Sequence, residues 1–114
     1  MGVVYYANFF VYFEMGRTEF LRQMGMPYSE MEKAQIFFPV TETYCKFRSP
    51  ALYDDVLIIQ TWISELKHAT VEFSYKIIRE EDQKLVAEGF TKLASLNASR
   101  RPTSLPEKLK SLLS

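Results

Sequence analysis

Glu14, Cys45 and His68 are the side chains whose types and surroundings in this sequence first suggest chemistry. A cysteine and a histidine together could act as a nucleophile and its base. Cys45, however, lies in a stretch with strand-like alternation, where a small core residue is expected, and no third group is evident that would orient His68. A metal would need several clustered ligands, which these residues do not supply. We therefore predict neither a cysteine nucleophile nor a bound metal.

Glu14 lies in an aromatic-rich segment, at helical spacing from Phe10 and close to Phe13. Apolar neighbours would raise the pKa of its carboxyl group and suit it to acid–base catalysis. The alternative is that Glu14 pairs with Arg17 or Thr18 and only organises the helix. Both roles stay open, and Glu14 is kept as a candidate catalytic residue.

The segment that carries Glu14 is predicted to be a helix of about 16 residues, roughly 24 Å long. Asn8 is a favourable N-cap, and Gly25 followed by Pro27 is a favourable stop. Apolar residues lie mostly at three- and four-residue spacings and surround much of the first turns: Phe9, Phe10, Val11, Tyr12, Phe13, Met15, Phe20, Leu21 and Met24. Such a helix must be covered by a large surface, and we expect a sheet.

From Phe37 onward apolar residues tend to recur at every second position, which is typical of strands. The clearest strand is predicted at Ala69–Arg79, where one face is apolar and the other polar. Three more strands are predicted at Phe37–Arg48, Asp55–Glu65 and Lys84–Asn97, and short helices at Tyr28–Lys33 and Pro106–Leu113. Trp62 and Phe73 are expected to pack on the opening helix. The chain is thus predicted to be one α+β domain over residues 1–114, a curled antiparallel sheet wrapped around one long helix, which dimerises through an edge strand or the second sheet face.

Composition excludes several other classes of protein. Fourteen basic and fourteen acidic residues leave no net charge, so no large electrostatic surface for nucleic acid or a membrane is predicted. No apolar run approaches the ~20 residues of a membrane span, and the opening segment lacks the basic start of a signal peptide. The single cysteine rules out an internal disulfide framework. A cytoplasmic protein is expected.

Two stretches and the tail of the chain resemble the hotdog-fold acyl-CoA thioesterases of the 4-hydroxybenzoyl-CoA thioesterase branch, which includes those associated with the bacterial Tol-Pal system. The stretches read GVVYYANFFVYFEMGRTEFLR and YCKFRSPALYDDVLIIQTWISEL, and the tail contains Arg101-Pro102 and Leu105-Pro106-Glu107. The resemblance implies a hotdog fold whose first strand is missing here, and hydrolysis of an acyl-CoA thioester at sites between subunits of a homodimer or homotetramer. CoA would enter as part of the substrate, and no cofactor is implied.

The resemblance also implies how the thioester carbonyl is polarised. The backbone N–H of Tyr6, at the start of the long helix, would donate to the carbonyl oxygen, and Asn8 would shape that helix start. The alternative is that both residues only pack and cap. In this branch the catalytic carboxylate is usually an aspartate three residues before the glycine that stands here as Gly2, which places it upstream of Met1.

Coenzyme A carries phosphates, so its site needs basic residues near the mouth. By resemblance, Lys67, Arg100 and Arg101 match positions that often contact the nucleotide phosphates, with Lys46 and Arg48 as weaker candidates. Solvated surface charge is the alternative for each of them. A hotdog protein that binds acyl-CoA or acyl carrier protein without hydrolysis is the second function considered, and an interaction domain the third. The acyl group is left open.

Overall fold

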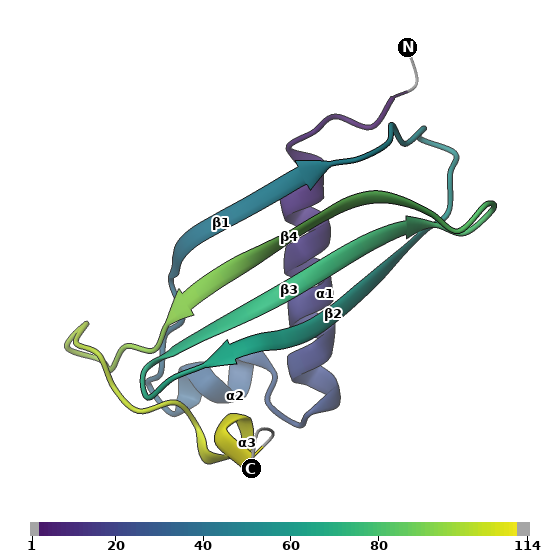
Figure 1. Cartoon of the computed structure of the whole chain (residues 1–114). Helices are drawn as coiled ribbons and strands as arrows, with labels where there is room; N and C mark the ends of the chain where they lie inside the picture. Colours follow the sequence, from purple (N-terminus) through teal and green to yellow (C-terminus); the bar gives the residue numbers. More distant parts are fainter. Residues whose placement is uncertain (1–2, 112–114) are drawn as a thin grey trace.

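The computed structural model describes residues 3–111, and one long helix crosses one face of a four-stranded antiparallel sheet (Figure 1). The strand order is β1-β4-β3-β2, so β1 and β2 form the edges. None of the described helices is long and apolar enough to cross a membrane. The elements in chain order are α1 (Asn8–Gln23), α2 (Tyr28–Lys33), β1 (Val40–Phe47), β2 (Leu57–Leu66), β3 (Thr70–Arg79), β4 (Lys84–Ala94) and α3 (Glu107–Lys110).

These elements confirm the predicted order of helices and strands, with shifts at the ends. β1 begins at Val40 rather than Phe37, because Pro39 precedes it and cannot donate to a ladder. Phe37 forms an isolated bridge with Leu96 beyond the end of β4. The residues Gly2 and Leu113, which the sequence analysis also used, lie outside the described residues.

The predicted end of α1 is confirmed. Gly25 adopts a left-handed conformation with φ of 77°, which glycine reaches without steric cost. The N–H of Met26 then donates to the carbonyl of Leu21 at 2.9 Å, and the N–H of Gly25 donates to that of Arg22 at 3.0 Å. The last carbonyls of the helix are satisfied by this turn.

The predicted N-cap at Asn8 is wrong. Asn8 is the first residue of α1, Ala7 occupies the cap position, and no side chain of residues 3–111 caps the helix. The backbone of Ala7 is already helical (φ −65°, ψ −22°), and the N–H of Asn8 donates to the carbonyl of Tyr5 at 3.0 Å. The chain therefore enters α1 through a tight backbone turn. The hydrogen bond within this turn satisfies an N–H group that a side-chain cap would otherwise satisfy.

The core lies between α1 and the near face of the sheet. Phe13, 1% exposed, stacks on Tyr75 of β3 with ring centroids 4.3 Å apart. Gly16 lets α1 approach β2 closely, because a Cβ there would lie 2.9 Å from Ile59 and still closer to the hydroxyl of Thr61. The predicted alternation of β3 is confirmed, since its helix-facing residues are all buried: Val71, Phe73, Tyr75 and Ile77.

Trp62 does not pack on the helix as predicted, whereas Phe73 does, with its ring edge-to-face against Phe20 at 5.6 Å. Trp62 pairs with Ser74, which lies on the face of the sheet away from α1, and it is 40% exposed. The helix-facing residues of β2 are its neighbours at positions 61 and 63, which pair with the buried residues of β3. The period of two therefore places position 62 on the opposite face.

Candidate active site

The segment before α1 is held against the loop that follows β1. The N–H of Val4 donates to the carbonyl of Ala51 at 2.7 Å, and Val3 bridges Leu52. A hollow of about 350 Å³ opens at this place and is lined by Val3, Val4, Tyr6, Phe9, Phe47, Arg48, Ser49, Pro50 and Ala51. The start of α1 lies beside the end of the edge strand β1 (Figure 1), and it borders this hollow, whose lining is largely apolar.

The backbone of this turn leaves the N–H groups of Tyr5, Tyr6 and Ala7 unused by the described part of the chain. The N–H groups of Asn8, Phe9 and Phe10 donate to the carbonyls of residues 5, 6 and 7 at 3.0–3.2 Å. No hydrogen bond to another residue within 3–111 uses the N–H of Tyr6 or Ala7. Successive free amides at the positive end of a helix dipole can stabilise an oxyanion. Tyr6 was found from the resemblance; Ala7 was missed, because only the turn shows its N–H to be unpaired.

Glu14 lies on the exposed side of α1, two turns from its start. Phe10 and Phe13 do not enclose its carboxyl group as predicted, since Phe13 turns inward to the core and Phe10 is 38% exposed. Glu14 instead lines an open hollow of about 610 Å³ between α1 and β2, with Val11, Met15, Gly16, Thr18, Glu19 and Ile59. It lies outside the lining of the hollow at the helix start.

The predicted partner of Glu14, Arg17, is buried instead, with 8% of its surface exposed. Its Nε donates to the hydroxyl of Tyr28 at 2.9 Å, and its Nη1 donates to that of Tyr75 at 3.2 Å. Burial alone would lower the pKa of Arg17, but the two phenol oxygens outweigh it and raise that pKa. Arg17 thus ties α1 to α2 and β3. Its spacing of four residues from Phe13 was the signal that could have revealed its burial.

Cys45 faces the helix side of β1 and is half-buried. Burial raises the pKa of its thiol to about 11, so the thiolate is scarce near neutral pH. That Cys45 is not a nucleophile stays a prediction.

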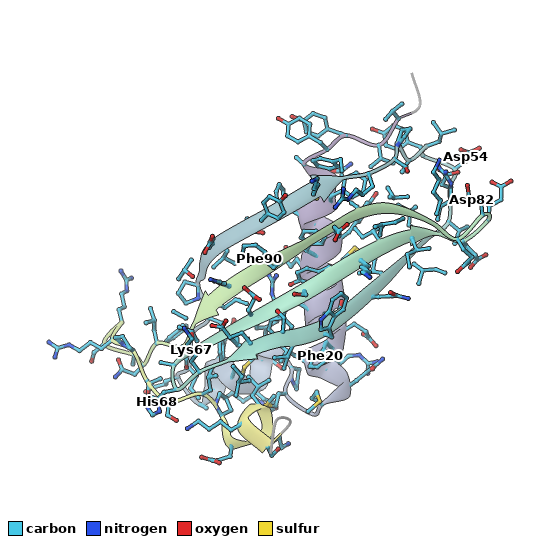
Figure 2. The ribbon with its side chains drawn as sticks, in the orientation of Figure 1. Phe20, Asp54, Lys67, His68, Asp82 and Phe90 are labelled. Carbon is cyan, nitrogen blue, oxygen red and sulfur yellow. The ribbon has the colours of Figure 1, made fainter. Side chains whose placement is uncertain are left out.

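The predicted phosphate-binding residues lie at the other end of the sheet. Lys67, in the β2–β3 turn, is exposed and forms an ion pair with Glu65 at 3.2 Å. Figure 2 places Lys67 and His68 at the opposite end of the sheet from Asp54 and Asp82. The antiparallel register puts this turn beside the start of β1, whereas the hollow at Tyr6 lies at the end of β1.

Arg100 and Arg101 follow β4, and the loop after β4 lies at the same end of the sheet as the β2–β3 turn (Figure 1). Arg100 has a positive φ of 61° and borders a hollow of about 630 Å³, lined also by Phe37, Phe38, Pro39, Leu96 and Ala98. Within one chain, then, the structure does not bring Lys67, Arg100 and Arg101 to the helix start. The sequence analysis had grouped these three basic residues with the start of α1.

Comparison with known proteins supports the family resemblance. The family model described as the thioesterase-like superfamily matches residues 1–113. A protein of Aquifex aeolicus named as an esterase is 39% identical over 70% of this chain and 62% of its own length, so the chain spans less than two thirds of that relative. The acyl-CoA thioesterase YbgC of Haemophilus influenzae is 30% identical over 96% of this chain and 80% of its own.

Solved structures resemble the whole described fold. A DHNA-CoA thioesterase from Staphylococcus aureus superposes with a TM-score of 0.91 at 25% identity, over 99% of this chain and 80% of that one. The superposition and the curled sheet around α1 confirm the hotdog fold that the resemblance implied.

Proposed function

Since the chain belongs to the thioesterase-like superfamily, we propose that it is an acyl-CoA thioesterase, which hydrolyses a thioester to the free acid and CoA. The observation that carries this proposal is that no hydrogen bond within residues 3–111 uses the N–H groups of Tyr6 and Ala7, which lie beside a mostly apolar hollow at the start of α1. A thioester carbonyl fits such a place, because its oxygen gains negative charge as the carbonyl carbon is attacked.

In the proposed reaction the oxygen of water bonds to the carbonyl carbon and the carbon–sulfur bond breaks. The N–H of Tyr6 donates to the carbonyl oxygen, and the dipole of α1 favours the charge that develops there. The thiolate of CoA leaves and takes up a proton. A carboxylate is needed to activate the water or to attack directly. No Asp or Glu is among the described residues that line the hollow, and Glu14 remains a candidate from another subunit.

We propose that the enzyme acts as a homodimer through the edge of β1. This strand is exposed along nearly its whole length, with Val40, Tyr44 and Phe47 each between 46% and 49% exposed. An edge strand of this kind pairs readily with a copy of itself, and a twofold axis makes such a pair antiparallel. The end of β1 at Phe47 then lies beside the start of the partner's β1.

This pairing would bring together the two sets of residues that one chain keeps apart. The hollow at Tyr6 adjoins Phe47, and the hollow at Arg100 adjoins the start of β1 through Pro39. The partner's Arg100 and Arg101 would therefore approach the helix start of the first subunit and could bind the phosphates of CoA. A cytoplasmic location is proposed with this function, since CoA thioesters are intracellular substrates and the one cysteine is free.

Replacing the donor itself is the direct test. Tyr6→Pro removes the N–H without breaking a hydrogen bond to a described residue, and proline is tolerated just ahead of a helix. We expect kcat for acyl-CoA hydrolysis to fall by about 10²–10³-fold, the usual cost of losing an oxyanion donor. Tyr6→Phe, which keeps the N–H, is the matched control and should retain most of the activity. An equal kcat in both variants would overturn the role of this amide.

Free thiol release, followed alongside titration with acyl-CoA, separates hydrolysis from binding alone. Binding with thiol release supports the thioesterase. Binding without thiol release would instead indicate a protein that holds acyl-CoA.

A further inference from the structure

Arg79, the last residue of β3, contacts two segments that lie far apart in the sequence. Its Nε and Nη2 donate to the two carboxylate oxygens of Asp82, in the turn after β3, each at 3.0 Å. Its Nη1 donates to the carbonyl of Pro50 at 3.0 Å and lies 3.7 Å from the carboxylate of Asp55. Arg79 therefore joins the β3–β4 turn to residues 48–56, here called the β1–β2 loop.

The pairing with Asp82 fixes the direction of the guanidinium group. A carboxylate that binds a planar guanidinium at two points holds it in one orientation, so Nη1 of Arg79 points at the β1–β2 loop. These hydrogen bonds raise the pKa of Arg79 and lower the pKa of Asp82, so both groups are charged near neutral pH. Only 16% of the Arg79 side chain is exposed, whereas 47% of the Asp82 side chain is. Figure 2 shows Asp82 and Asp54, a residue of the β1–β2 loop, at the same end of the sheet.

The middle of the β1–β2 loop holds the acceptor that fixes the chain ahead of α1. The carbonyl of Ala51 accepts the N–H of Val4 at 2.7 Å, and Ala51 is 1% exposed. Arg79 contacts the loop on both sides of Ala51, at the carbonyl of the preceding residue and at the carboxylate of Asp55. That carboxylate also accepts the N–H of Leu52 at 2.9 Å, which closes the turn over residues 52–55. The contacts of Arg79 therefore flank the anchor of Val4.

The ends of the β1–β2 loop are held differently from its middle. At one end the N–H of Ser49 donates to the carbonyl of Val86 at 3.1 Å, and at the other the N–H of Glu80 donates to the carbonyl of Val56 at 2.9 Å. These backbone hydrogen bonds do not involve the side chain of Arg79. Loss of that side chain should therefore release the middle of the loop while its ends and the sheet stay in place.

The direction of the Tyr6 N–H depends on the anchor of Val4. Only Tyr5 separates these two residues, and its carbonyl accepts the N–H of Asn8 at 3.0 Å. A shift of Val4 is therefore passed to the Tyr6 N–H within one residue of chain. Misplacing a group that acts on the reacting atoms by about 1 Å can lower a rate by about 100-fold.

We propose that Arg79 is a positioning residue for the oxyanion site at Tyr6, because it holds the β1–β2 loop on both sides of the acceptor of Val4. The proposal rests on the proposed function, which gives the Tyr6 N–H its role. Arg79 is not among the described residues that line the hollow at Tyr6, so it acts through the loop backbone and not by touching the substrate. The alternative is that Arg79 only stabilises the β3–β4 turn, and its loss would then leave the Tyr6 N–H in place.

Amide hydrogen exchange tests the positioning without any substrate. In Arg79→Gln we expect the N–H of Val4 to exchange at least about tenfold faster than in the unmodified protein, because its acceptor is no longer held. The N–H of Phe73, in the middle of β3, should exchange at its original rate. Unchanged exchange at Val4, or equal acceleration at Val4 and Phe73, would overturn the proposal. Asp82→Asn weakens the same contacts from an exposed position and should also accelerate exchange at Val4, which keeps the test decisive where Arg79→Gln fails to fold.

Kinetics test whether the positioning acts on the Tyr6 N–H. We expect Arg79→Gln to lower kcat for acyl-CoA hydrolysis by about 10–100-fold. In the Tyr6→Pro protein, where that N–H is already absent, Arg79→Gln should lower kcat further by less than about twofold. Losses that multiply would show that Arg79 acts elsewhere and would overturn the proposal. An unmodified protein that does not hydrolyse acyl-CoA would instead contradict the proposed function, and exchange at Val4 would still decide whether Arg79 positions this segment.

Arg22→Gln is the matched control. Arg22 also binds a carboxylate three residues away, that of Glu19, at two points. Its side chain is 63% exposed on α1, and its hydrogen bonds within residues 3–111 all go to Glu19. Arg22→Gln should match the unmodified protein both in kcat and in exchange at Val4. A loss of kcat as large as that of Arg79→Gln would show that the effect is not particular to Arg79.

Discussion

The two faces of the sheet can be compared residue by residue, because neighbouring positions on each strand point to opposite sides. On the side of α1, Phe73, Tyr75 and Ile77 are each at most 1% exposed. On the face of the sheet away from α1, the outer face, Tyr44 and Trp62 keep 48% and 40% of their surface in contact with solvent. Both faces are rich in aromatic groups, yet among the described elements a helix covers only one of them.

The difference separates folding from association. Aromatic groups under α1 lose their contact with water when the chain folds, so their burial contributes to the stability of one subunit. Those on the outer face gain most of that benefit only if another surface covers them. The same kind of substitution should therefore destabilise the fold on one face and weaken assembly on the other.

The largest expected effect comes from the matched pair Phe13→Ala and Phe90→Ala. Phe13 is 1% exposed and stacked on Tyr75, so its truncation should lower the free energy of unfolding by about 3–5 kcal/mol. Phe90 lies half-buried on the outer face, and its truncation should cost about 1 kcal/mol or less in a single subunit. Urea denaturation at low protein concentration measures both. Equal losses would mean that the two faces do not differ in this way.

The arrangement of elements could be predicted from the sequence because the spacing between apolar residues is a local signal. Spacings of three and four identified α1, and alternation identified β3, whose buried residues are those predicted. Side-chain chemistry at the start of α1 was less informative. The cap assigned to Asn8 was wrong because a backbone turn from Tyr5 closes the helix start instead.

The candidate site was harder to predict because its parts come from distant segments. Nothing local to Arg100 shows that it lies at the opposite end of the sheet from Tyr6, since strand register decides this. Arg17 was considered only as a possible partner of Glu14, because its actual partners, the phenol oxygens of Tyr28 and Tyr75, are far away in the chain. The face that Trp62 occupies depends on which alternate residues of β2 point toward α1. Because several consecutive residues of β2 are apolar, the sequence did not show this alternation.

An intermediate effect is expected at Cys45, whose reactivity tests whether water reaches the helix side of the sheet near its edge. Burial raises the pKa of this thiol from an ordinary value of 9.0 to about 11. Since the thiolate is the reactive form, at pH 8 its fraction in the folded protein should be about 100-fold smaller than in the unfolded chain. The rate of reaction with a disulfide reagent, compared with and without guanidinium chloride, measures this ratio.

Reaction of Cys45 should then accelerate about tenfold for each pH unit up to the raised pKa. A folded protein that reacts as fast as the unfolded chain would show that water reaches this part of the helix-side face. The comparison between the two faces would then hold only for the inner strands.

The smallest expected effect has the opposite sign and distinguishes two threonines on the helix side of the sheet. The hydroxyl of Thr61 is buried against α1 and has no hydrogen-bond partner among the described residues. Thr43 instead donates its hydroxyl to the carbonyl of Phe90 at 3.0 Å. Thr61→Val removes an unsatisfied polar group and should raise the free energy of unfolding by about 0.5–1 kcal/mol. Thr43→Val loses a hydrogen bond and should lower it by about the same amount. Urea denaturation of the two variants measures the signs, and destabilisation by Thr61→Val would show that this hydroxyl finds a partner in solution.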